Sequence, residues 1–149
     1  MWVFLDDKRK SPLIVHNNSR GLGEIVGKSD RWVYARNYDE FIEIVKSNFD
    51  QIDLISFDHD IDSWEDILDD NGIINPVERT GKTAAQYVID FCMDNGKVLP
   101  NWFVHSDNSK GNENIRSLLT NYMHKSENRI IGKMMIPFGY VDGQFFYHL

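Results

Sequence analysis

The stretch DLISFDHD at residues 53–60 decides the fold, because a short apolar run, Leu54 to Phe57, ends directly in Asp58, His59 and Asp60. Two other apolar runs have the same form: Trp2 to Leu5 before Asp6-Asp7, and Trp102 to Val104 before His105-Ser106. Runs without polar alternation are typical of parallel strands that are buried on both faces. The carboxyl ends of such strands form the crevice of an open α/β sheet, so we expect these three ends to share one site.

The segments around these runs predict an alternation of strands and helices. Asn37 and Glu40 have the spacing of a helix cap with its partner, and Thr80 is a cap candidate for a helix that stops at Asn95-Gly96. The further elements that we expect are strands at 31–35, about 99–104 and about 129–136, and helices at about 38–49 and 112–125. Residues 8–30 are expected to form a loop or a short hairpin.

These elements predict one α/β domain, residues 1–149, with a doubly wound parallel sheet and helices on both of its faces. Residues 61–79, which are rich in Asp, Asn and Gly, form an insertion that is a candidate lid. Asp142-Gly143 predicts a hairpin over about 137–149, which we expect to add to an edge of the sheet.

Composition excludes several classes of protein. A formal charge of −7 argues against binding of extended duplex DNA. The single cysteine, Cys92, favours a reducing compartment, and the start MWVFLDDKRK lacks the charge order of a signal peptide. No apolar stretch approaches the roughly 18 residues of a membrane span. We therefore expect a cytoplasmic protein.

Carboxylates that gather at the strand ends repel one another unless a cation binds among them, and hard oxygen ligands suit Mg²⁺ or Mn²⁺. The candidate metal ligands are Asp6, Asp7, Asp58 and Asp60. Asp58 is also a candidate catalytic group, together with His59 and His105, whose imidazoles exchange protons near neutral pH. The alternative for each residue is an ordinary helix cap or a solvated surface group.

A phosphate site is predicted at the end of the run 102–104. The hydroxyl of Ser106 and the backbone near Asn108 lie close to a helix start, where phosphate oxygens bind, although a simple helix cap explains the same pattern. Lys110 and Arg36 are candidates to neutralise the phosphate charge. Trp64, inside the polar insertion, is a candidate to stack on a base or ring.

Four segments carry a resemblance to a known family: LDD at 5–7, RNYDEF at 36–41, DLISFDHD at 53–60 and HSDNSKGNENIRSLLTNYM at 105–123. Together they resemble the cyclic-phosphate processing receiver domain family over about residues 1–125. The resemblance implies a receiver-like sheet of five parallel strands in the order 2-1-3-4-5. It also implies that Asp6-Asp7 is the metal-binding pair, that Asp58 stands at the phosphoacceptor position, and that Ser106 is the receiver hydroxyl.

Three hypotheses follow for the function. The leading one is a Mg²⁺-dependent phosphoesterase, a hydrolase for 2′,3′-cyclic phosphate ends in RNA repair or for a related nucleotide. The second is a signalling receiver that is phosphorylated on Asp58, against which stand the adjacent His59 and the lack of a lysine at the end of the fifth strand. The third is an adaptor or inhibitor that binds a nucleotide or a protein partner in the same crevice without turnover.

Overall fold

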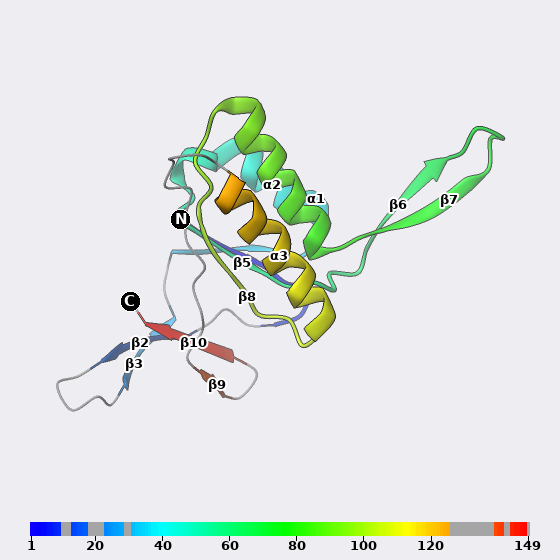
Figure 1. Cartoon of the computed structure of the whole chain (residues 1–149). Coiled ribbons are helices and arrows are strands. Elements are labelled where there is room, and N and C mark those ends of the chain that lie inside the picture. Colours follow the sequence, from blue (N-terminus) through cyan, green and yellow to red (C-terminus); the bar gives the residue numbers. More distant parts are fainter. Residues whose placement is uncertain (10–12, 18–22, 29–30, 126–138, 142–143, 149) are drawn as a thin grey trace.

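A four-stranded parallel sheet forms the centre of the protein in the computed structural model, which describes residues 1–9, 13–17, 23–28, 31–125, 139–141 and 144–148 (Figure 1). Its strands are β1 (Trp2–Leu5), β4 (Trp32–Ala35), β5 (Leu54–Phe57) and β8 (Asn101–Val104), in the order β4-β1-β5-β8. This agrees with the 2-1-3-4 part of the predicted order. The predicted fifth strand, at about 129–136, lies outside the described residues.

Three helices cover one face of this sheet: α1 (Tyr38–Asn48), α2 (Gly81–Asn95) and α3 (Ser109–Lys125), with the 3₁₀ turn η1 (Phe49–Gln51) after α1 (Figure 1). The predicted start of α1 and end of α2 are confirmed, whereas α3 begins at Ser109 and not at about 112. Asn37 accepts a hydrogen bond from the backbone of Glu40 at the start of α1, and Gly96 ends α2 in the left-handed conformation at φ 61°. The helices bury side chains such as Phe41 and Val88 against the sheet, and the residues between the helices and the sheet form the main hydrophobic core.

The other face of the sheet carries a second core of aromatic residues, in which Trp2, Phe4, Trp32 and Phe103 pack with Leu54. In the described part of the chain no helix covers this face, so the prediction of helices on both faces is wrong there. β4 lies on one side of β1, whereas β5 and β8 lie on the other side, so the chain crosses from β1 to β4 in the opposite direction to the later crossovers. A right-handed crossover in that direction lies on this second face of the sheet. That connection contains strands instead of a helix.

These strands are β2 (Leu13–Asn17) and β3 (Gly23–Lys28), which form an antiparallel hairpin. The C-terminal strands β9 (Gly139–Val141) and β10 (Gln144–His148) pair antiparallel as predicted. On its other side, β10 pairs in parallel with β2. The C-terminal hairpin therefore belongs to a second sheet, β3-β2-β10-β9, and is not an addition to the edge of the parallel sheet. The predicted turn at Asp142-Gly143 lies outside the described residues.

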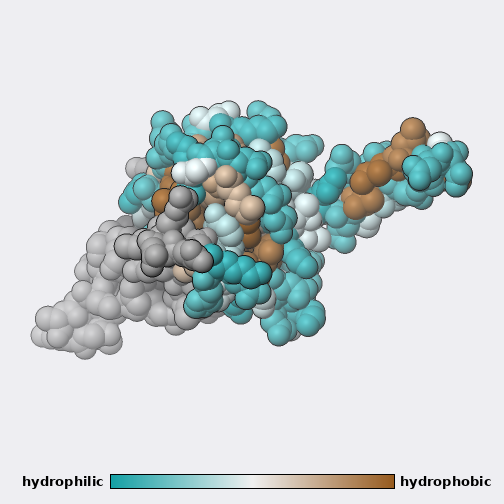
Figure 2. All heavy atoms as spheres, turned by 45° about the horizontal axis from the view of Figure 1, so that its top comes forward, coloured by the Kyte–Doolittle hydropathy of each residue, from teal (hydrophilic) through white to brown (hydrophobic). Residues whose placement is uncertain are grey.

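The insertion after β5 is a two-stranded ribbon, β6 (Ser63–Leu68) and β7 (Ile74–Arg79), that projects from the body of the protein (Figure 1). The insertion is thus a regular ribbon, in which the residues of the two strands pair from Ser63 with Arg79 to Leu68 with Ile74. Figure 2 shows exposed hydrophobic side chains along it. Leu68 and Ile74 are the most exposed aliphatic residues of its two strands. Within the described residues, no helix is both long enough and apolar enough for a bilayer crossing.

Candidate functional site

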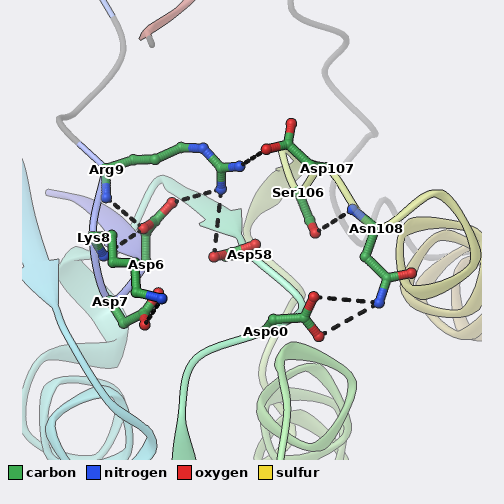
Figure 3. A pocket seen from close by; sticks show the side chains of 9 residues that line it. All are labelled: Asp6, Asp7, Lys8, Arg9, Asp58, Asp60, Ser106, Asp107 and Asn108. Atoms are coloured by element: carbon green, nitrogen blue, oxygen red, sulfur yellow. Dashed lines mark hydrogen bonds and ion pairs between the residues drawn. The ribbon is translucent and has the colours of Figure 1, made fainter.

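A pocket of about 300 Å³ lies where the carboxyl ends of β1, β5 and β8 meet (Figure 3). Its lining consists of Asp6, Asp7, Lys8, Arg9, Asp58, Asp60, Ser106, Asp107 and Asn108. Segments that are far apart in the sequence are brought together because β5 pairs with β1 on one side and with β8 on the other. The three polar strand ends therefore do form one site.

Asp6 is completely buried and is held from two directions. The backbone amides of Lys8 and Arg9 donate to its Oδ1 at 2.8 and 2.6 Å, and its Oδ2 lies 2.9 Å from Nε2 of His105. Burial disfavours the charged form, but the hydrogen bond with His105 and the two amides outweigh it, so the pKa of Asp6 lies below its usual range. Asp6 is therefore an ionised, fixed acceptor.

His105 lies beneath the pocket and not in its lining. Complete burial lowers its pKa, although the hydrogen bond to Asp6 opposes this, so the imidazole is neutral at pH 7. Because Asp6 can only accept, Nε2 carries the hydrogen, and Nδ1 accepts from the hydroxyl of buried Ser56. The ring also stacks on Phe4, with centroids 4.5 Å apart. His105 thus orients Asp6.

Asp58 ends the central strand β5 and is 4% exposed. Its Oδ1 accepts a hydrogen bond from the backbone of His59 at 2.8 Å. Burial, together with the negative charge of Asp6, raises the pKa of Asp58 to about 6, against the opposing effect of Arg9. A carboxyl group with this pKa exchanges a proton close to neutral pH, which is the property of a general acid or base.

Arg9 supplies a positive charge to the pocket that the sequence analysis did not identify. Its Nη1 lies 3.3 Å from Oδ2 of Asp6 and 3.5 Å from Oδ2 of Asp58, and its Nη2 pairs with Asp107 (Figure 3). The signal in the sequence was the basic run Lys8-Arg9-Lys10 directly after the acidic pair. A guanidinium ion in this position reduces the repulsion between the two carboxylates.

The donor atoms present are suited to a divalent cation. Asp6, Asp58 and His105 each offer one ligand atom within 4.8 Å of the others. Two carboxylates suit Mg²⁺ or Mn²⁺, and the imidazole suits a transition metal better than Mg²⁺. Arg9 contacts both carboxylates, so an ion bound between them would compete with its Nη1 for their oxygens. Asp7 and Asp60 line the pocket outside this group of three.

Ser106 and Asn108 lie in the pocket lining as the sequence analysis expected. The hydroxyl of Ser106 accepts from the backbone of Asn108 at 3.0 Å and hydrogen-bonds to the carboxyl of Asp58. Asn108 caps α3, since its Oδ1 accepts from the backbone of Gly111 at 2.8 Å, and its Nδ2 lies 3.3 Å from Asp60. The helix cap and a position in the pocket are therefore both present.

The other candidate residues lie at the margin of the pocket or outside it. Nδ1 of His59 is 2.8 Å from Asp60, and its ring packs on Gly111. Arg36 donates to the backbone carbonyls of Asp6 and Arg9 at 2.9 and 2.7 Å, so it braces the loop after β1. Lys110 is exposed on α3, 3.6 Å from Glu113.

Gly81 sets how closely α2 approaches the pocket. Its backbone amide donates to the carbonyl of His59 at 2.8 Å, and a Cβ atom at this position would lie 1.7 Å from the carbonyl oxygen of Asp58. Only glycine therefore fits, and the start of α2 supports the backbone of Asp58 from behind.

Comparison with protein-family models gives a match to the cyclic-phosphate processing receiver domain over residues 1–121. This span contains β1, β4, β5, β8 and the whole lining of the pocket. Comparison with curated proteins and with solved structures gives no match.

Proposed function

The chain belongs to the cyclic-phosphate processing receiver domain family, and from this premise we propose that it is a metal-dependent phosphoesterase. Its proposed substrate is a 2′,3′-cyclic phosphate at an RNA end or on a related nucleotide. The observation that carries the proposal is the convergence of the carboxyl groups of Asp6 and Asp58 and the guanidinium group of Arg9 in one pocket.

Asp6 and Asp58 are the residues that would hold a divalent cation, and His105 orients Asp6 from behind. When bound, such an ion neutralises charge on the phosphate oxygens and lowers the pKa of water. Binding and orientation come from the chain. His105 fixes Asp6 from below, and Arg36 holds the loop that carries Arg9 by donating to its backbone carbonyl.

Two donors beside the carboxylates are suited to the phosphate group. A guanidinium group presents two parallel N–H bonds that match two phosphate oxygens, so Arg9 is suited to bind the substrate once it leaves the carboxylates. The hydroxyl of Ser106 lies next to Asp58 and is a further donor. Both groups come from loops that follow strands of the rigid sheet.

Hydrolysis of a cyclic phosphate opens one P–O bond to the ribose and adds the oxygen of one water molecule to phosphorus. Asp58 serves this reaction in one of two ways: it takes a proton from the attacking water, or its carboxylate attacks phosphorus and water then cleaves the acyl phosphate. In both cases a proton goes to the departing ribose oxygen. The product is a phosphate monoester.

Turnover of an oligoribonucleotide that ends in a 2′,3′-cyclic phosphate tests the proposal, with Mg²⁺ or Mn²⁺ and with EDTA. We expect EDTA to abolish turnover and Asp58→Ala to reduce it at least about 100-fold. Asp50→Ala, which removes an exposed acid that pairs with Lys97, is the matched control and should keep the wild-type rate. Equal rates for wild type and Asp58→Ala would overturn the proposal.

One observation favours a second function, that of a phosphorylated receiver. Asp58 and Ser106 follow the neighbouring strands β5 and β8 and are hydrogen-bonded to each other. A phosphoacceptor and its hydroxyl partner occupy these positions in receivers. Acetyl phosphate with Mg²⁺ should then add one phosphoryl group to wild type and none to Asp58→Ala, as measured by mass spectrometry. Absence of the modified species in wild type contradicts this function.

A further inference from the structure

A second pocket, of about 510 Å³, lies at the base of the β6–β7 ribbon, beside the start of α1. It follows the first pocket along the same edge of the sheet, because Asp60 lines the first pocket and Asp62 lines the second. Two residues of extended chain span at most about 7 Å. The linings of the two pockets therefore come within about 7 Å of each other at these two residues, a distance close to the length of one sugar.

We propose that this second pocket is the subsite for the nucleobase of the substrate, and that it selects bases with an exocyclic amino group over uracil. The inference rests on the proposed function for the position of the phosphate. It adds which nucleotides the site accepts and names the residues that read the base.

Flat side chains line the second pocket. The indole ring of Trp64 is 59% exposed on β6, and the guanidinium carbon of Arg79 lies 5.8 Å from the centre of the Tyr38 ring. Glu65 holds this guanidinium group through a hydrogen bond from Nε at 2.7 Å. Aromatic rings and arginine planes are the surfaces on which proteins stack unpaired bases.

The pocket is held rigidly enough to act as a subsite. The backbone amide of Tyr38 donates to the hydroxyl of buried Ser63 at 2.9 Å, which joins the first residue of α1 to the first residue of β6. Trp64 is held in the ribbon by pairing with Glu78 on β7. The stacking residues therefore come from elements whose relative position is fixed by hydrogen bonds.

The charges of the lining determine which base edge fits. Asp39, Asp62 and Glu65 contribute carboxylates, which only accept hydrogen bonds when ionised. Cytosine, adenine and guanine carry an amino group that donates to a carboxylate, whereas uracil presents an oxygen at the position where cytosine has its amino group and donates only through its ring N–H. Two acceptors that face each other repel, so cytosine and uracil, which have rings of equal size, are the sharpest pair for comparison.

The proposal is tested by isothermal titration calorimetry of the full chain with cytidine 3′-monophosphate, uridine 3′-monophosphate and ribose 3-phosphate. We expect the affinity to fall in that order. Trp64→Ala should weaken binding of the cytidine ligand roughly 5- to 150-fold, and Trp64→Phe should restore most of it. Leu68→Ala, an exposed residue of the same strand outside the pocket, is the matched control and should bind as wild type does.

Equal affinity of wild type for the cytidine ligand and for ribose 3-phosphate overturns the proposal, and so does a Trp64→Ala variant that binds like wild type. Asp62→Asn, which introduces a donor, should narrow the difference between the cytidine and uridine ligands. The calorimetric experiment measures binding and not turnover, so it tests the base subsite independently of the proposed phosphoesterase activity. Turnover without base preference removes only the subsite, and base-selective binding without turnover removes only the phosphoesterase.

Discussion

Replacement of Asp58 by asparagine should make the protein more stable above pH 6. The pKa of this carboxyl group is raised from 3.8 to about 6, by burial first and by the charge of Asp6 second, with Arg9 as the opposing influence. The folded state therefore binds a proton on Asp58 more tightly than the unfolded chain does. Its contribution to stability is fully present below pH 3.8 and is lost as the pH rises through 6.

The magnitude follows from the two pKa values. A change from 3.8 to about 6 corresponds to about 3 kcal/mol of folding free energy once the pH exceeds both values. Two effects make the stabilisation by Asp58→Asn smaller than this value: solvent reaches the pocket, and the variant loses the ion pair with Arg9. The second effect is small because Arg9 keeps Asp6 and Asp107 as partners. We therefore expect Asp58→Asn to raise the free energy of unfolding by about 2 kcal/mol at pH 7.5 and by almost nothing at pH 4.

Urea unfolding of both proteins at a series of pH values between 4 and 8, without divalent ions, measures this difference. Asp50→Asn removes the same charge from an exposed position and controls for the general effect of a smaller net charge, which is −7 in wild type. The reasoning is refuted if Asp58→Asn is less stable than wild type at pH 7.5, or if its gain is the same at pH 4.

Three further predictions concern the supports of the pocket. Gly81→Ala places a methyl group against the carbonyl of Asp58, so thermal unfolding should show a loss of about 1–3 kcal/mol, and a variant as stable as wild type contradicts the close contact. Ser56→Ala removes the hydroxyl partner of buried His105, which should lower the free energy of unfolding in urea by about 1–3 kcal/mol, while an unchanged value speaks against the pairing. Arg9→Gln removes the charge that opposes the rise in the pKa of Asp58, so carbon-13 NMR should show that the Asp58 carboxyl group titrates above pH 6. A pKa of Asp58 below 6 in this variant contradicts the ion pair.

The local signals in the sequence predicted the parts of the site that depend on strand ends. Asp58 and Ser106 lie in one pocket because apolar runs without alternation form neighbouring parallel strands. The ribbon was also signalled, since Asp70, Asn71 and Gly72 stand between apolar residues, and Gly72 adopts φ 76° in the turn. The high content of Asp and Asn in this segment hides the two strands, because acidic residues are uncommon in strands.

The sequence by itself determined the parallel sheet and the convergence of acidic residues at its edge, because hydrophobic periodicity depends on local patterns. The order of the first four strands came from the resemblance to the receiver family, and the structure has that order. Only the tertiary structure decided that Arg9 lies between the two carboxylates and that His105 is buried beneath Asp6. These positions arise from contacts between residues up to 99 apart in the chain. Electrostatic interactions depend on the distance between charges in the folded protein, which cannot be read from the spacing of residues in the sequence.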